Sequence, residues 1–566
     1  MKSRVLIYIV ATSVIAAVAI PSPLSAQDQQ HSQKLPYYVV KDLGTLGGRE
    51  GVAEGISDRG WVVGSANLAG DQSGHAFLWR NGVMTDLGTL GGLNSQEQWP
   101  VKDKRGLIVG AAETAAIDPF NEDFCGFDSN SGVPPTGLIC VGFLWRNGVM
   151  TALPTRGGNN AQALGINNRG QAVGMAEQSS EDPNCIPPQV LDIQAVIWGP
   201  KEGEIQILPP LPGDISAWGI GINDAGQVVG LSGDCMSPNF NASGAPTPQH
   251  AVVWQNGTAT NIGTLGGSYI FPWAINSKGQ VTGQASPPGD TTLHSFLWWK
   301  GVMTDLGEIP GDFGSIAFGL NDAGQVVGGS CDQNFNCRAF LWQDGVMTDL
   351  NTLVKPGSTP LYLFFGNDIN SRGEIAFYAF DQNKVEFHAA IGIPCDANHA
   401  GVEGCEELAT DPGVVPATSE RPKVSLPENI RERLSKRLGF GLFNPGATAD
   451  NAQRATVNFL REDLGINSGR AASTITECSG DPSSGITDKR PDANNFQLWG
   501  NCGVDQSTHR LNGSCFTSHG ITGHCQWGTA NPQQCPVGAP PRSVGSWPCS
   551  RIDRILYDLW RRCQFY

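Results

Sequence analysis

Short stretches of alternating hydrophobic and polar residues recur along the chain. In the first copy, four such stretches occupy 52–56, 61–64, 75–79 and 83–87. In the third of these, His75, Phe77 and Trp79 fall on one face of an extended strand. Asp-Arg-Gly and Asn-Gly separate the stretches and are typical of tight hairpin turns. The pattern predicts four short antiparallel strands.

The same unit recurs as I-N-D-x-G-x-V-V-G, then F-L-W, then G-V-M-T-D-L-G-T-L-G-G. The glycines of its first hairpin are Gly60, Gly106, Gly170, Gly226, Gly279, Gly324 and Gly373. Seven copies, each carrying four strands within ~40–50 residues, predict an all-β fold, namely a seven-bladed β-propeller. The Trp that ends F-L-W is interpreted as packing between blades.

The two ends of the repeat region complement each other. The seventh copy ends at 387–391 without a fourth strand, whereas 38–48 precedes the first copy and matches 84–92. We therefore predict that the N-terminal strand completes the last blade, which removes two exposed sheet edges. The propeller then covers about 37–394.

Three consecutive copies carry long insertions between their second and third strands. These occupy 111–140, 175–193 and 231–249, and the predicted topology raises all three on one side of the ring. Insertions on one face of a repeat protein often form its binding face, although tolerated drift of surface loops is the competing interpretation.

Two groups of residues near this face are candidate ligand contacts. Aromatic residues at the start of the innermost strands suit stacking on a sugar, with packing between blades as the alternative: Trp99, Trp218, Phe271 and Trp273. Acidic loop residues offer the oxygen ligands of Ca²⁺: Asp118, Asp123, Asp128 and Asp234. Because no D-x-D-x-D-G loop is present, a solvated acidic rim is the preferred interpretation, and no cofactor is expected.

The N-terminus indicates export. Residues 1–26 combine a positive start, an apolar run and a small-residue end, as a secretory signal does, and no later stretch is apolar enough to cross a bilayer. Export permits disulfides. The eight cysteines before the tail can pair locally, as Cys125–Cys140, Cys331–Cys337, Cys395–Cys405 and Cys185–Cys235. A secreted, periplasmic or cell-surface location is expected.

The pattern changes after the last copy. Residues 395–426 are predicted to be a linker, and 427–566 a Cys-rich region that is either partly helical or disordered, or the product of an altered reading frame. A helix is predicted at 427–438. Cys515, His519, His524 and Cys525 match no standard zinc spacing, so no metal site is predicted.

Composition and charge limit the classes of function that the chain can have. The net charge of −16 argues against nucleic-acid binding, which needs Lys and Arg to neutralise phosphates. The innermost strands carry Glu54 but no convergent acid and base. The favoured hypothesis is a monomeric, non-enzymatic binding or scaffold module for a protein or glycan of the cell envelope. The alternative is an extracellular polysaccharide-acting hydrolase or lyase with an axial site.

The best copies also resemble a known family. His75-Ala76-Phe77-Leu78-Trp79, followed by 81–92 with the sequence N-G-V-M-T-D-L-G-T-L-G-G, is similar to the HAF family of bacterial probable extracellular repeats. The resemblance covers about 37–394. It departs at 138–145, at 194–198 and at 387–391. It implies export and a repeat fold, and it implies no activity for particular residues.

Overall fold

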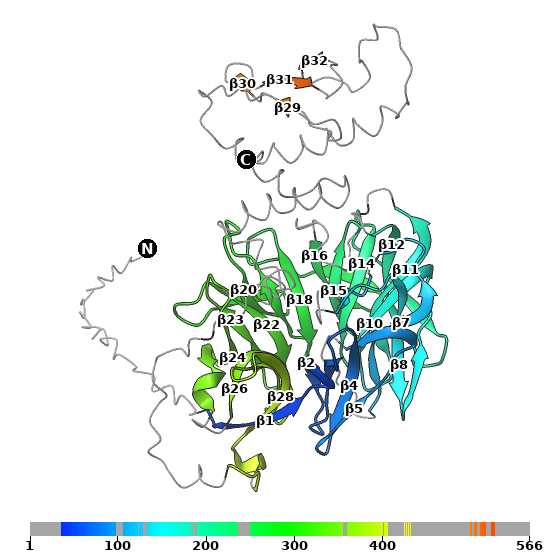
Figure 1. Cartoon of the computed structure of the whole chain (residues 1–566). Helices are drawn as coiled ribbons and strands as arrows, with labels where there is room; N and C mark the ends of the chain where they lie inside the picture. The colour runs from blue at the N-terminus through cyan, green and yellow to red at the C-terminus, as the bar shows by residue number, and fades with distance from the viewer. Residues whose placement is uncertain are drawn as a thin grey trace, which may run out of the picture. The chain divides into compact units, whose positions relative to one another are not determined.

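The computed structural model divides the chain into two compact units, Met1–Thr456 and Val457–Tyr566. Placement is described for 35–97, 106–122, 124–127, 133–182, 185, 189–235, 249–354, 359–399, 401–405, 424, 426, 428 and 431, and for four short strands of the second unit. The described part of the first unit is built almost entirely of β-strands (Figure 1). The predicted signal at 1–26 lies outside the described residues.

Five four-stranded antiparallel sheets repeat one order among the described residues, with strands adjacent in sequence also adjacent in the sheet. The first two are β6 (Gly91–Gln96), β7 (Ile108–Ile117), β8 (Leu138–Arg146), β9 (Val149–Ala152), and β10 (Gly157–Ile166), β11 (Ala172–Glu181), β12 (Leu191–Trp198), β13 (Ile205–Leu208). The third and fourth are β14 (Ser216–Ile222), β15 (Val228–Gly233), β16 (Gln249–Gln255), β17 (Thr258–Asn261), and β18 (Ile270–Ile275), β19 (Val281–Ala285), β20 (His294–Trp299), β21 (Val302–Gly307). The fifth is β22 (Gly314–Leu320), β23 (Val326–Cys331), β24 (Cys337–Gln343), β25 (Val346–Asp349).

A sixth, mixed sheet joins the two ends of the repeat region. Its strands are β26 (Leu361–Ile369), β27 (Ile375–Asp381), β28 (Glu386–Pro394), β2 (Gly47–Ile56), β3 (Val62–Leu68), β4 (Gly74–Arg80) and β5 (Val83–Asp86), with β1 (Tyr38–Gly44) paired to β28. Strand β1 runs antiparallel to β28 from the pair Tyr38↔Pro394 to the pair Gly44↔Ala389. The predicted pairing of the N-terminal strand with the last repeat is thus confirmed.

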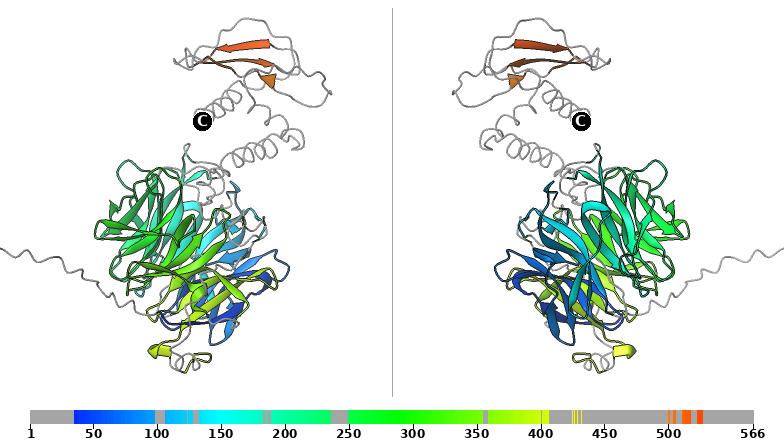
Figure 2. Two further views of the ribbon diagram at one scale, coloured as in Figure 1. Left: turned by 90° about the vertical axis from the view of Figure 1, so that its left-hand side faces the viewer. Right: turned by 90° about the vertical axis from the view of Figure 1, so that its right-hand side faces the viewer.

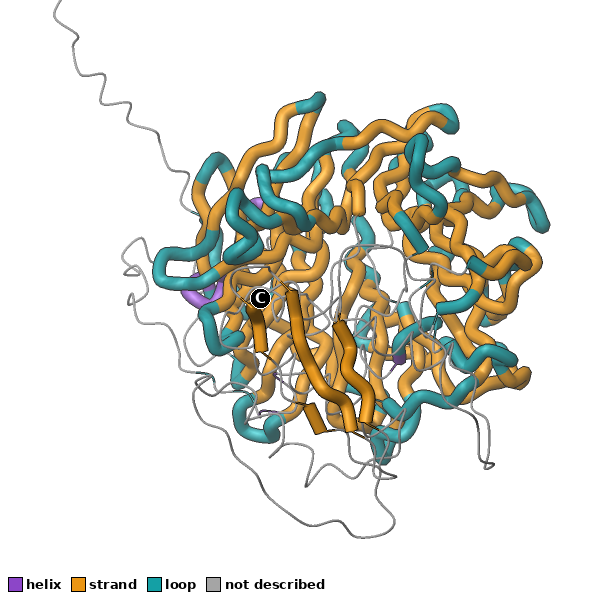
Figure 3. Tube along the Cα trace, turned by 90° about the horizontal axis from the view of Figure 1, so that it is seen from above, coloured by secondary structure: helices purple, strands orange, loops and turns teal. Residues whose placement is uncertain are grey.

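The sheets follow one another in a closed cycle. The third strand of each repeat contacts the first strand of the next, as β4 contacts β6 and β24 contacts β26, and β28 contacts β2 to close the series. The first strands β14, β18, β22 and β26 also contact one another in turn, which places them on the inside. The sheets therefore surround a common centre, in a β-propeller-like all-β fold (Figure 2) (Figure 3).

The I-N-D-x-G turns tie neighbouring sheets together. The buried Asn223 accepts the backbone N–H of Gln227 at 2.9 Å and donates to the Gln227 side chain at 2.8 Å. It also donates to the carbonyl of Asn276 in the next sheet at 3.0 Å. The inter-sheet bond recurs from Asn167 to Asn223, from Asn276 to Asn321, from Asn321 to Asn370 and from Asn370 to Ser57. We call this series the asparagine belt.

The V-V-G glycine is required by close approach of the first two strands. A Cβ on Gly230 would lie 1.9 Å from the carbonyl oxygen of Trp218, and one on Gly174 would lie 1.9 Å from that of Gln162. Any side chain would push the second strand off the first. The repeated glycine therefore sets how tightly each sheet packs near the centre.

Outside the sheets, the described residues of the first unit include two short helices and a few residues that follow the last strand. Short 3-10 helices occupy Leu350–Leu353 (η1) and Ala397–His399 (η2). Glu428 and Arg431, the described residues of the helix predicted at 427–438, are helical. Val424 and Leu426, inside the predicted linker, are buried. None of the described helices is both long and apolar enough to cross a bilayer.

The second unit contains a small sheet. Its strands are β29 (Trp499–Gly500), β30 (Gly503–Asp505), β31 (Arg510–Phe516) and β32 (Thr522–Gln526), and β31 pairs with each of the other three. The side chains of Cys515, His519, His524 and Cys525, for which no metal site was predicted, lie outside the described residues. The sheet is a structural finding that the composition of this region did not predict.

Candidate binding face

The three insertions leave the ring on one side. They are the connections β7–β8, β11–β12 and β15–β16, and each follows the second strand of its repeat. Because strands alternate in direction, all connections at this position lie at one end of the sheets, and the I-N-D-x-G turns lie at the other. We call the side with the insertions the insertion face.

The first insertion folds inward over the inner strands. Its base closes where the Asp118 N–H donates to the Gly137 carbonyl at 2.9 Å. The Gln96 side chain on β6 donates to the carbonyl of Cys125 at 2.6 Å, and that of Gln162 on β10 donates to the carbonyl of Phe124 at 3.2 Å. The buried rings of Phe124 and Phe127 complete the contact, so this part of the insertion packs against the inner strands.

A buried carboxylate network joins the first insertion to the second. Asp118 and Glu122 from the first insertion and Glu177 on β11 all accept hydrogen bonds from the side-chain amide nitrogen of Asn160, at 3.1–3.2 Å. The Gln189 amide, within the second insertion, donates to Glu122 at 3.3 Å and to Glu177 at 2.8 Å. All five side chains are buried. The network therefore fixes one insertion against the next repeat.

The carboxyl pair of this network holds a proton tightly. Burial raises the pKa of Glu177 to about 8, and the neighbouring Glu122 carboxylate adds to the rise. Burial also raises the pKa of Glu122, although the backbone N–H groups of Val190 and Leu191 oppose the shift. Two buried carboxylates in contact would repel each other strongly if both were ionised, so the pair shares a proton near neutral pH.

The network differs from the predicted acidic rim. Asp118 was expected to be a solvated loop residue or an oxygen ligand of Ca²⁺, but its side chain is buried and accepts the backbone N–H groups of Phe120 and Glu122. The Asn160 nitrogen, a donor, occupies the point on which the three carboxylates converge. The correction follows from the inward fold of the insertion, which the sequence pattern did not show.

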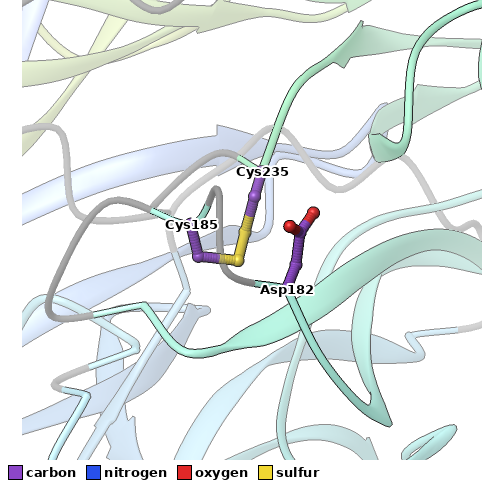
Figure 4. Close-up of side chains that lie close together, drawn as sticks. All are labelled: Asp182, Cys185 and Cys235. Atoms are coloured by element: carbon purple, nitrogen blue, oxygen red, sulfur yellow. A yellow bond between two sulfur atoms is a disulfide. The ribbon is translucent and has the colours of Figure 1, made fainter. Parts of the chain in front are cut away.

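A disulfide joins the second insertion to the third. Cys185 after β11 bonds to Cys235 after β15, so two neighbouring repeats are covalently linked (Figure 4). Asp182 brings a carboxylate within 4.8 Å of both sulfur atoms. Since a disulfide offers no thiolate to a metal ion, we interpret this group as a structural link.

The other three disulfides between described cysteines are short-range. They are Cys125–Cys140, Cys331–Cys337 and Cys395–Cys405. Together with Cys185–Cys235, these are the pairs that the cysteine positions suggested. Four disulfides indicate an oxidising compartment outside the cytoplasm.

The predicted aromatic contacts are buried. Trp218, Phe271 and Trp273 are at most 8% exposed, so none of them presents a free ring face to a sugar. The tilted rings of Phe271 and Trp273 lie 4.5 Å apart between centroids, and Trp273 meets Phe318 edge to face at 5.2 Å. Trp99 lies outside the described residues. Packing between sheets is therefore the better interpretation of the three described aromatics.

These rings begin an arc that runs over the inner strands β18, β22 and β26 and ends on β28. From Phe318 on β22 the arc passes to Phe365 at 5.5 Å, and Phe365 contacts Phe364 at 4.6 Å on β26. Phe364 contacts Phe387 at 5.7 Å on β28. We call these rings, from Phe271 to Phe387, the aromatic arc. It belongs to one hydrophobic cluster with residues of the first insertion and with Val424 and Leu426.

The other predicted site residues are scattered. Asp234 is exposed beside Cys235, and Asp123 and Asp128 lie outside the described residues. Glu54 on β2 is buried and accepts the Asn367 amide at 3.2 Å. Sequence reasoning missed Asp368 on β26, which is buried and accepts the backbone N–H of Ile56 at 3.0 Å. A charged residue on an otherwise largely apolar inner strand was the available signal.

Histidines on the third strands pair with the aspartate of the D-L-G sequence on the fourth strand. His75 lies 2.8 Å from Asp86, His294 2.9 Å from Asp305, and His388 2.9 Å from Asp42. Each pair joins the third and fourth strands of one repeat. The last pair joins β28 to the N-terminal strand and so contributes to closure. The motif is interpreted as structural.

Comparison with known proteins gives similarity of fold only. No family model matches the chain, and no curated protein matches it. A puromycin-hydrolysing peptidase of Mycobacterium tuberculosis is 10% identical, with a TM-score of 0.38 over 64% of this chain and 55% of that one. The acylaminoacyl peptidase of Pyrococcus horikoshii is 12% identical, with a TM-score of 0.35 over 60% and 50%. A gluconolactonase from Xanthomonas campestris is 8% identical, with a TM-score of 0.28 over 64% and 96%. The match spans about half the length of the two peptidases.

Proposed function

We propose that this protein is an exported, non-enzymatic binding or scaffold module, and that a protein or glycan of the cell envelope binds its insertion face. We further propose that the sheets are the blades of a seven-bladed β-propeller of HAF type, secreted or periplasmic, and active as a monomer. An acidic ring with a net charge of −16 on the chain suits such a partner better than a nucleic acid.

The observation that carries the proposal is the linkage of three neighbouring insertions. The carboxylate network ties the first to repeat three, and Cys185–Cys235 ties the second to the third. A face held in one arrangement loses little conformational entropy on binding, so the same contacts give a higher affinity. Exposed apolar side chains on the first insertion supply contact area, with Ile117 77% and Phe120 37% exposed.

The test is a binding screen of the wild type against glycans and purified cell-envelope fractions. The double variant Ile117→Ser/Phe120→Ser should lower the affinity for the partner found at least tenfold. Val149→Ser is the matched control, because Val149 is 62% exposed in the same repeat but begins β9 at the opposite end of the sheet. Equal binding by the double variant and the wild type would remove the insertion face from the proposal.

The enzymatic alternative has its own outcome in the same screen. Turnover of a polysaccharide that is lost in Glu54→Gln would favour a hydrolase or lyase with an axial site. Glu54 is chosen because the Asn367 amide donates a hydrogen bond to its carboxylate, and such a bond would hold a catalytic carboxylate in place.

A further inference from the structure

The first repeat departs from the others at its I-N-D-x-G turn. Ser57 stands where five other repeats have the asparagine of the belt, and Trp61 stands where they have a glutamine or a glutamate. Those residues are Gln171, Gln227, Gln280, Gln325 and Glu374. The turn is still closed, because the Ser57 N–H donates to the Trp61 carbonyl at 2.9 Å and the Trp61 N–H donates to the Ser57 hydroxyl at 3.2 Å. An indole thus replaces a polar side chain in a turn of the same kind.

Two arginines lie over this indole. The guanidinium carbon of Arg59, from the same turn, is 5.3 Å from the centroid of Trp61, and that of Arg80 is 5.6 Å from it. Arg80 comes close because Val62 pairs with Trp79 between β3 and β4, which makes Trp61 and Arg80 the next pair in register. Both arginines are exposed, whereas Trp61 is half-buried. The hairpin that follows Arg80 lies on the same side as the I-N-D-x-G turns, because strand directions alternate.

Among the described residues, neither of these arginines forms an ion pair. Two acidic groups of the adjoining turns are engaged with other partners. Asp58 accepts the backbone N–H of Ser371 at 3.1 Å, and the buried Glu374 lies 2.5 Å from the guanidinium of Arg372. On a chain with a net charge of −16, two unpaired guanidinium groups at one indole form a local positive site.

Arginines held in this way suit a carboxylate or a phosphate. A guanidinium over an indole is attracted by the negative face of the ring and keeps its N–H donors at its edge, where they match the oxygens of such a group. Contact with Trp61 also restricts two long side chains before a ligand arrives, which lowers the entropy lost on binding. Because one exposed ion pair contributes little, a ligand that offers several anionic groups in succession is favoured.

We propose that Arg59, Arg80 and Trp61 form a binding site for the carboxylate or phosphate groups of an anionic polymer. We call it the arginine–tryptophan site. The proposal goes beyond the proposed function, because this site lies on the side of the ring opposite to the insertion face. A molecule with both sites holds two components of the envelope at once.

The first test measures binding of the full chain to three probes at low ionic strength. They are polygalacturonate, which carries carboxylates, inorganic polyphosphate, and neutral dextran. The wild type should bind an anionic polymer and not dextran, and added salt should weaken the binding because the charges are exposed. Binding of polygalacturonate alone identifies a carboxylate ligand, and binding of polyphosphate alone identifies a phosphate ligand. If the wild type binds neither anionic polymer, the proposal is wrong.

The second test removes the two charges. Arg59→Gln/Arg80→Gln should lower the affinity for the polymer that binds by roughly tenfold or more. Arg146→Gln/Arg169→Gln is the matched control, because it removes the same charge from the equivalent exposed positions of repeats that lack this tryptophan. The control should bind as the wild type does. Equal losses in the two double variants would reveal general attraction by charge and overturn the proposal, as would no loss in the first.

A third variant keeps the charges and removes the indole. Trp61→Leu should fold, since the second repeat has Leu107 at this position, and thermal unfolding checks that it does. Its affinity for the polymer should fall about threefold, because the two arginines lose their support. An affinity equal to that of the wild type would exclude Trp61 from the site. The variant Ile117→Ser/Phe120→Ser should bind the probes as the wild type does, so its loss of envelope binding bears on the proposed function alone.

Discussion

The side chain of Asn223 donates a hydrogen bond to the backbone carbonyl of Asn276 in the neighbouring sheet, at 3.0 Å. The same bond links each of the other described asparagines of the belt to the following repeat. Sheets in this fold otherwise meet through side-chain packing, which is less directional than hydrogen bonding. The asparagine belt therefore fixes the angle at which one sheet follows the next.

Replacement of Asn223 by alanine should destabilise the ring. It removes the bond to Asn276 and leaves the half-buried side chain and N–H of Gln227 without their partner, for a loss of about 2–3 kcal/mol in the free energy of unfolding. Urea unfolding measures this loss. Ala225→Ser, at an exposed position of the same turn, is the control and should be neutral. Equal stability of N223A and the wild type would show that this bond of the belt makes no net contribution to the free energy of unfolding.

The strands were predictable from the sequence, whereas the belt was not. Alternation of apolar and polar residues identifies each strand locally, and the repeat multiplies the evidence. The turn that contains Asn223 was predicted as a hairpin from its Asp and Gly. Its acceptor is a backbone carbonyl in another sheet, however, and every residue has such a carbonyl. The recurrence of Gln or Glu four residues after Asn was the one local signal.

Removal of the N-terminal strand should open the ring. Strand β1 covers the outer edge of β28 from Pro394 to Ala389, and His388 contributes a bond to Asp42. Deletion of residues 37–44 exposes that edge, and we expect aggregation and a lower melting temperature. Light scattering and thermal unfolding measure both. Deletion of residues 27–34 is the control. A protein without 37–44 that melts as the wild type does would contradict the pairing.

The carboxylate network makes stability depend on pH. The pKa of Glu177 is raised to about 8, so the folded state holds a proton that the unfolded state releases above about 4.5. Stability from this group is therefore fully present below about pH 4.5 and is lost as pH rises towards 8. Glu177→Gln carries an amide hydrogen in place of that proton and should flatten the dependence between pH 5 and 8.

Thermal unfolding at several pH values compares this variant with Glu181→Gln, an exposed position on the same strand. The control should keep the slope of the wild type. Identical slopes in all three proteins would mean that Glu177 titrates as an ordinary surface carboxyl.

Burial of loop residues accounts for most of what the sequence did not predict. Asp118 and Glu122 lie in a long insertion rich in polar residues, which is typical of a solvated loop. Their burial depends on Gln96 and Gln162, which hold the insertion from two different strands. Val424 and Leu426 lie in a Pro-rich stretch without periodicity, so nothing local distinguishes them from linker residues. In both cases tertiary packing determines which residues are buried, and no short sequence pattern predicts that burial.

The disulfide between repeats should stabilise the protein more than a local one. Cys185–Cys235 closes a loop with a sequence separation of 50, and Cys331–Cys337 one of 6. The entropy removed from the unfolded chain corresponds to about 4 kcal/mol for the first and about 2 kcal/mol for the second. Cys185→Ser/Cys235→Ser should therefore lower the free energy of unfolding by about 2 kcal/mol more than Cys331→Ser/Cys337→Ser does. Urea unfolding of both double variants measures the difference.

The larger loss should come with faster proteolysis of the second and third insertions, because the disulfide that links them is gone. A larger loss in the Cys331 and Cys337 variant would instead show that local packing around the aromatic arc outweighs the restraint between repeats.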